Sequence, residues 1–119
     1  MNWYYKYKRN LPWRKTKNPY FIWISEIILQ QTTVKQGIPF YKKFINRYPN
    51  LKLLANAKEE NDLKLWQGLG YYARARNLHY TSKIILKKYK GDFPSTFEEL
   101  IKLKGIGDYT ASAIGSIAF

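Results

Sequence analysis

A single carboxylate within an otherwise apolar run is the first candidate catalytic residue of this sequence. Glu26 lies in the stretch 20–29, which is aliphatic and aromatic apart from Ser25 and the glutamate itself. A helix that is apolar nearly all round belongs in a core, where an ionised carboxylate is costly and its pKa should rise. A carboxyl group that keeps its proton near neutral pH is what a general acid needs. A solvent-facing glutamate, or one paired with a lysine, explains the same position equally well.

Two glycines around one apolar residue mark a second candidate site. In Gly105-Ile106-Gly107 the glycines allow positive φ and a close backbone approach, while the isoleucine can plug the turn into the core. The amides that open the next helix would then point outward with the positive end of the helix dipole, which suits a phosphate. A plain helix–helix turn could use the same residues. Leu103 before the turn and the small residues at 110–113 after it favour an anchor for a nucleic-acid backbone.

A similar junction occurs earlier in the chain and adds aromatic and basic side chains. Its residues are Gly68, Leu69, Gly70, Tyr71, Tyr72, Arg74 and Arg76. Arginines can clamp phosphates, and a tyrosine at a loop tip can wedge between bases. Tyrosines that pack inward beside solvated arginines would explain the segment equally well.

The charge of the chain indicates a polyanionic partner. The 119 residues include 21 Lys+Arg against 8 Asp+Glu, a formal net charge of +13. Nucleic acid is the first expectation and an anionic membrane surface the second. Eleven tyrosines and four tryptophans offer faces on which bases can stack, although ordinary packing accounts for most of them. This length predicts a single domain.

Several classes of protein are disfavoured by what the sequence lacks. It has no cysteine, which excludes disulfides, thiol catalysis and cysteine-bound metals for these residues. Its one histidine, His79, argues against a zinc site. No secretory signal follows Met1, and the longest apolar stretch is too short to span a bilayer. We therefore expect a soluble intracellular protein.

The helix that carries Glu26 is expected to be the longest apolar element. The pair Asn18-Pro19 suits a helix cap followed by the first helical position, and the pattern predicts helix over 19–35. At helical spacing, Glu26, Gln30 and Thr33 share one face of it.

The rest of the chain is predicted to be helical as well. Glycine and proline at 37–39 predict a turn. Further helices are expected at 1–9, 40–47, 59–66, 71–89, 95–103 and 108–118, with a short apolar segment at 51–57 and a capping box at 95–98. Since no segment alternates with the period of a strand, the fold class is all-α with about seven short helices.

Five segments together resemble the adenine DNA glycosylases of the MutY type, in the helix-hairpin-helix DNA glycosylase superfamily. They are Leu-Pro-Trp-Arg at 11–14, Trp-x-Ser-Glu-x-x-Leu-Gln-Gln-Thr at 23–32, Trp-x-Gly-Leu-Gly-Tyr-Tyr-x-Arg-x-Arg-Asn-Leu at 66–78, Phe-Pro at 93–94 and Leu-x-Gly-Ile-Gly-x-Tyr-Thr-Ala at 103–111. The resemblance covers nearly the whole chain. Enzymes of this type remove adenine mispaired with 8-oxoguanine or guanine, after flipping the adenine into a pocket.

The resemblance implies roles for individual residues. Glu26 matches the acid that protonates adenine at N7, and Tyr109 matches a tyrosine that supports the catalytic carboxylates. Arg14 matches an arginine near the flipped nucleotide, while Gln31 and Tyr71 match residues that insert at the lesion. The other matched positions that we expect to contact DNA are Gln30, Thr32, Gly68, Leu69, Gly70, Tyr72, Arg74, Arg76, Gly105, Ile106 and Gly107.

The residue at the hairpin also separates related activities. Sister enzymes that nick the strand carry a lysine nucleophile where this chain has Tyr109, and tyrosine cannot form a Schiff base. A monofunctional adenine glycosylase is therefore expected. Thymine-mismatch glycosylases of the superfamily can also carry tyrosine here, and Glu26 favours adenine. A non-catalytic helix-hairpin-helix DNA-binding module is the other alternative. A membrane- or partner-binding bundle is disfavoured by the hairpin and the glutamate.

Compared with the family it resembles, the chain is expected to be an N-terminal fragment. Residues 1–18 would be an incomplete part of the terminal, iron–sulfur-side module, and 19–119 a truncated six-helix barrel with the helix-hairpin-helix at about 95–118. The catalytic aspartate, the four cysteines of a 4Fe–4S cluster and the domain that reads 8-oxoguanine would all follow Phe119. We expect a cytoplasmic monomer, nucleoid-associated if bacterial, that binds mismatched double-stranded DNA weakly and has little or no activity by itself.

Overall fold

The computed structural model describes residues 18–30, 32–66 and 72–118, and these residues form helices and no strand. The helices are α2 (Pro19–Leu29), α3 (Val34–Arg47), α4 (Leu51–Ala55), α5 (Glu59–Trp66), α6 (Tyr72–Lys88), α7 (Phe97–Leu100) and α8 (Asp108–Ala118). The prediction of an all-α fold is thereby confirmed. The helix predicted at 1–9 lies outside the described residues.

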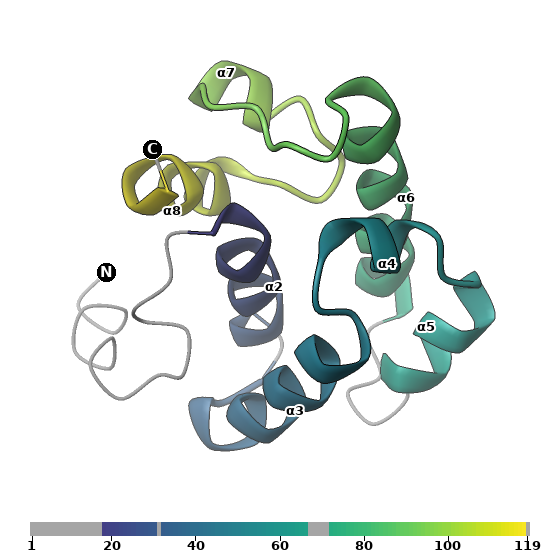
Figure 1. Ribbon diagram of the computed structural model, residues 1–119. Helices are drawn as coiled ribbons and strands as arrows, with labels where there is room; N and C mark the ends of the chain where they lie inside the picture. Colours follow the sequence, from purple (N-terminus) through teal and green to yellow (C-terminus); the bar gives the residue numbers. More distant parts are fainter. Residues whose placement is uncertain (1–17, 31, 67–71, 119) are drawn as a thin grey trace.

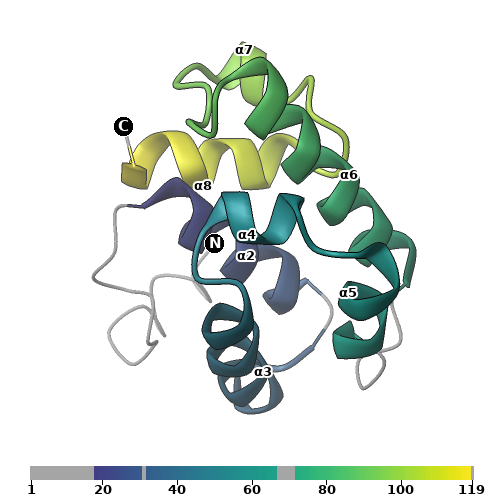
Figure 2. The same cartoon turned by 45° about the vertical axis from the view of Figure 1, so that its right-hand side comes forward.

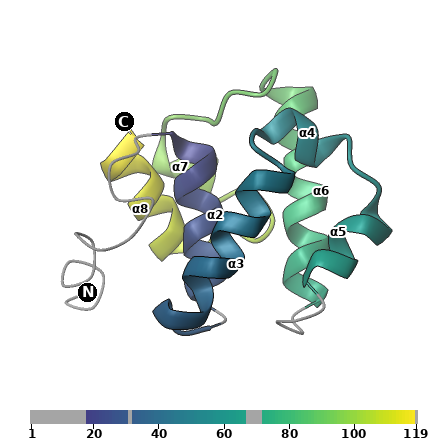
Figure 3. The ribbon, with the colours of Figure 1, turned by 60° about the horizontal axis from the view of Figure 1, so that its bottom comes forward.

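Helix α2 lies between two other helices, with α3 along one side and α8 along the other (Figures 1 and 3). Helix α6 packs against α4 and α5, and α7 packs against α8. Figure 2 shows α8 running crosswise between α7 and α2. Aromatic side chains join the two groups of helices, because the Trp66 ring of α5 lies 5.0 Å from that of Phe40 and 5.9 Å from that of Phe44, both of α3.

Helix α2 begins as its sequence predicts. The Asn18 side chain accepts a hydrogen bond from the Tyr20 amide at 2.9 Å, and Pro19 occupies the first turn. Nearly every side chain of the helix is buried. Full burial of one large apolar side chain stabilises a fold by about 1.5–3 kcal/mol, so packing on all sides fixes the position of this helix.

The end of α2 differs from the prediction of one helix over 19–35. The helix ends at Leu29, and Thr33 starts the next helix by accepting a hydrogen bond from the Gln36 amide at 3.3 Å. Thr33 therefore does not share the face of Glu26. The signal that was missed is the spacing of Thr33 and Gln36, which is that of a capping box.

The turn predicted at 37–39 is also wrong, because both breaker residues lie inside α3. Gly37 is buried, and a Cβ added there would lie 3.2 Å from Cγ2 of Ile28 in α2. The missing side chain thus allows close contact between the two helices. Pro39 lies in the second turn of α3, where its missing N–H removes one backbone hydrogen bond. Packing against α2 overrides the local signals.

The remaining helices follow the predictions more closely. Helix α5 has the predicted bounds, and α6 and α8 fall within or on theirs. The segment 51–57 forms the short helix α4 and a turn. Helix α7 is capped by Thr96, but ends at Leu100 rather than near residue 103, because the chain continues in tight turns whose amides bond three residues back. None of the described helices has the length and apolar character needed to cross a membrane.

Candidate functional site

Glu26 lies in the middle of α2 and is almost completely buried, with 2% of its surface exposed. Its Oε1 atom has no hydrogen-bond partner among the described residues. Burial raises the pKa of this carboxyl group from its ordinary value of 4.5 to about 7. The predicted burial and raised pKa are confirmed. The solvent-facing alternative is wrong, and no lysine in the described ranges pairs with this group.

The predicted hairpin connects α7 to α8. Gly105 has φ +84°, a conformation that side-chain-bearing residues rarely adopt, and Ile106 is buried as the sequence predicted. The Thr81 hydroxyl of α6 donates a hydrogen bond to the Lys104 carbonyl, which fixes the entry to the turn. A Cβ added at Gly107 would meet nothing within 4 Å, so this side of the hairpin is open.

A shallow cavity of about 580 Å³ lies beside the hairpin. It is lined by Gln30, Arg74, Ile101, Leu103, Gly105, Ile106, Gly107, Asp108, Tyr109 and Thr110. Residues from α2, α6 and α8 therefore meet at one surface. Six of them were predicted from the sequence as site residues. Tyr109 is 38% exposed there.

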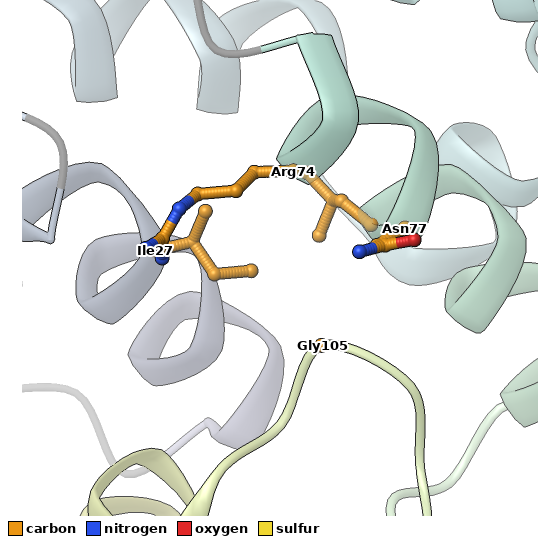
Figure 4. A pocket seen from close by; sticks show the side chains of 5 residues that line it. Ile27, Arg74, Asn77 and Gly105 are labelled. Carbon is orange, nitrogen blue, oxygen red and sulfur yellow. The ribbon is translucent and has the colours of Figure 1, made fainter.

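A smaller cavity of about 290 Å³ lies between α2, α6 and the hairpin. Arg74 reaches from α6 across this opening toward Ile27 of α2, while Asn77 lies on the same helix and Gly105 faces it from the hairpin (Figure 4). Leu78 completes the lining. Arg74 thus contributes to both cavities, and Glu26 lines neither of the two.

Gln30 connects the elements around the larger cavity. Its Nε2 atom donates to the Thr110 hydroxyl at 2.9 Å, and its Oε1 atom accepts a hydrogen bond from the Arg74 guanidinium. These two bonds join the end of α2 to α8 and α6.

Two other predicted residues, Thr32 and Arg76, make side-chain contacts outside this cluster. Arg76 forms an ion pair with Glu59 of α5, with 3.6 Å between the charged atoms. The Thr32 hydroxyl donates to the Gln36 side chain at 2.6 Å, and Tyr72 opens α6. The predictions for Arg14, Gln31, Gly68, Leu69, Gly70 and Tyr71 fall outside the described residues.

Three residues at the site were not predicted as site residues: Thr81, and also Asn77 and Thr110, which belong to the matched segments 66–78 and 103–111. Asn77 follows Arg74 at a spacing of three residues, which places both on one face of a helix and could have indicated it. The hydrogen bonds of the two threonines could not be predicted, because their partners lie 23 and 80 residues away in the chain.

The residues that the structure describes offer no set of donors for a metal cluster. Within the described ranges, no group of three histidine, cysteine or acidic side chains could hold a metal ion. The whole sequence lacks cysteine, so these residues cannot supply the ligands of a cysteine-bound iron–sulfur cluster.

The helical fold with its glycine hairpin defines a class of DNA repair protein. Residues 24–117 match the family described as HhH-GPD superfamily base excision DNA repair protein, and the chain belongs to this family. Within it, the chain is similar to adenine DNA glycosylases. It is 52% identical to that of Buchnera aphidicola subsp. Baizongia pistaciae and 41% identical to that of Homo sapiens, in each case over its whole length. It spans 34% and 23% of those proteins, respectively.

Solved structures show the same fold. A thermostable thymine-DNA glycosylase matches with a TM-score of 0.85 at 30% identity, over 92% of this chain and 51% of that one. Endonuclease III in a non-covalent complex with DNA matches with a TM-score of 0.77 at 27% identity, over 86% of this chain and 48% of that one.

Proposed function

We propose that this chain supplies the general acid of an adenine DNA glycosylase, which hydrolyses the N-glycosidic bond of adenine mispaired with 8-oxoguanine or guanine. The observation that carries the proposal is Glu26, a buried carboxyl group whose pKa is raised to about 7. It lies in a chain that is 52% identical to an adenine DNA glycosylase along its whole length.

In the proposed mechanism, Glu26 acts while it is neutral. Its proton passes to N7 of a flipped-out adenine, so that the base leaves without a negative charge. Because a raised pKa keeps the carboxyl group protonated up to about pH 7, the rate of adenine release should fall as the pH rises above this value. Tyr109 stands where a lyase would need a lysine, so the strand is not nicked by a Schiff-base route.

Binding to double-stranded DNA is the second part of the proposal. The net charge of +13 supports electrostatic attraction to phosphates, and a structural neighbour of this chain is endonuclease III in complex with DNA. We assign the contacts to the exposed side of the hairpin at 105–107 and to Arg74, and propose that the protein acts as a monomer. Affinity should decrease steeply with salt, as for any binding that releases counterions.

The proposed organisation has two parts. Residues 19–119 form most of a six-helix barrel that ends in the helix-hairpin-helix, and residues 1–18 belong to a second helical module. Any 4Fe–4S cluster of the whole protein must take its cysteine ligands from outside these residues, since the sequence contains none.

The experiment uses a chimaera, because the chain spans only a third of its bacterial relative. Residues 1–119 replace the matching part of the Buchnera aphidicola enzyme, and single-turnover release of adenine is measured on a duplex with adenine opposite 8-oxoguanine. Glu26→Gln should lower the rate constant by about 10²- to 10⁴-fold, the usual contribution of a general acid, with unchanged affinity for the duplex. Equal rates for the chimaera and its Glu26→Gln variant would contradict the proposal.

A second candidate function follows from the fold comparison. The structural neighbour with a TM-score of 0.85 is a thymine-DNA glycosylase, so thymine release from a G:T duplex is measured in parallel. Faster release of thymine than of adenine would favour this function. Tight binding with no release of either base by the chimaera would favour a non-catalytic DNA-binding module.

A further inference from the structure

We propose that Gln30 is a positioning residue that couples the hairpin to the helix carrying Glu26. The inference rests on the proposed function, since it concerns how contact with DNA at the hairpin is transmitted to the general acid. Gln30 is suited to this role because its backbone belongs to one of the two regions and its side chain bonds to the other.

The backbone of Gln30 is fixed to the turn that contains Glu26. Gln30 caps the C-terminal end of α2, and its amide donates to the Glu26 carbonyl at 3.1 Å. Movement of residue 30 therefore moves the last turn of α2, which starts at the glutamate.

The side chain of Gln30 is fixed to the first turn of α8. It donates to the hydroxyl of Thr110, which is buried. The next residue, Ala111, donates its amide to the Gly107 carbonyl at 2.9 Å. Thr110 is thus held in one turn with the second glycine of the hairpin.

The carboxamide of Gln30 also has a defined orientation. A guanidinium is a donor only, so Arg74 requires the oxygen of the carboxamide, and the NH₂ group is left for Thr110. The bond to Arg74 is charge-assisted. This bond holds the long Arg74 side chain, which would otherwise sample many rotamers, across the opening between α6 and α2 (Figure 4).

Loss of the Gln30 side chain should leave the fold intact. The hairpin keeps the bond from Thr81 to the Lys104 carbonyl and the buried side chain of Ile106. The effect should therefore fall on the relative position of the hairpin and Glu26. In a glycosylase that effect appears in the chemical step, where a displacement of about 1 Å can lower the rate on the order of 100-fold.

The test compares Gln30→Ala with Asn46→Ala, which removes an exposed carboxamide from α3, in the chimaera described above. We expect Gln30→Ala to lower the single-turnover rate of adenine release by about tenfold or more, with less than about a threefold change in Kd for the duplex. Hydrogen exchange at the start of α8 should be faster in this variant. Asn46→Ala should match the parent chimaera in all three measurements.

Equal rates and equal exchange in the two variants would overturn the inference. A loss of thermal stability in Gln30→Ala without a change in rate would also overturn it, since a structural role predicts that result. If Gln30→Ala does not fold, Gln30→Met keeps the length of the side chain and removes both hydrogen bonds, and the same criteria apply to it. If the parent chimaera releases no adenine, the proposed function fails, and the exchange rates at α8 alone decide whether Gln30 couples the two regions.

Discussion

Glu26 and the hairpin at 105–107 show two opposite ways of preparing a site. At Glu26, an ionisable side chain is buried among apolar residues, and burial changes its proton affinity. At the hairpin, side chains are absent at both glycines and the backbone itself is exposed. The chemistry of the first region therefore depends on its surroundings, while that of the second depends on its own backbone conformation. Substitution of Glu26 should therefore act through the loss of a shifted pKa, whereas substitutions at the hairpin should act through backbone conformation and DNA affinity.

The pH dependence of the unfolding free energy should change more than the stability does on substitution of either hairpin glycine. The folded-state pKa of Glu26, about 7, exceeds its ordinary value of 4.5, so the folded chain binds one proton more than the unfolded chain between these pH values. Stability contributed by this group is present below pH 4.5 and is lost as pH rises to about 7. The loss amounts to about 3 kcal/mol.

Glu26→Gln removes this titration, so comparison of the variant with the parent measures the contribution of the carboxyl group. The difference in unfolding free energy between the variant and the parent should shift by about 3 kcal/mol in favour of the variant as pH rises across this interval. Chemical denaturation at a series of pH values measures it. A difference that stays constant from acid to neutral pH would mean that the carboxyl group is hydrated in solution.

Gly105→Ala is expected to have an intermediate effect, on stability. With φ +84° at this position, an added Cβ should destabilise the fold by about 1–2 kcal/mol through the backbone conformation. Its distance of 3.4 Å from Cβ of Asn77 is close to ordinary van der Waals contact, so the backbone conformation sets the cost. Thermal unfolding measures the change, and a variant as stable as the parent would show that the turn adopts another conformation.

Gly107→Ala should have the smallest effect, and it should fall on binding alone. The new methyl group would meet nothing within 4 Å, so the unfolding free energy should change by less than about 0.5 kcal/mol. If the open backbone approaches a phosphate, affinity for duplex DNA should fall by about fivefold, which is about 1 kcal/mol. Titration of a labelled duplex at fixed salt measures this. Unchanged affinity would place the DNA contact elsewhere.

The sequence allowed both regions to be predicted because each is marked by a local signal. A lone carboxylate in an apolar run predicted the burial of Glu26, and glycine spacing predicted the hairpin. The errors arose where distant contacts override local preference. Gly37 and Pro39 favour a turn locally, yet they lie in a helix because the glycine permits contact with Ile28. The bond from Gln30 to Thr110 spans 80 residues, and no pattern within either segment indicates it.

The contact at Gly37 also bears on how this sequence can change in evolution. The Cβ of any other residue there would lie 3.2 Å from Cγ2 of Ile28 in α2, so the packing of α3 against α2 would have to adjust by a few tenths of an ångström. Exposed positions of α3, such as Lys42 and Lys43, carry no such constraint. A lineage can therefore exchange charges along α3 without altering the proposed acid. A single extra methyl group at residue 37, far from any DNA contact we propose, would select for a compensating change in α2.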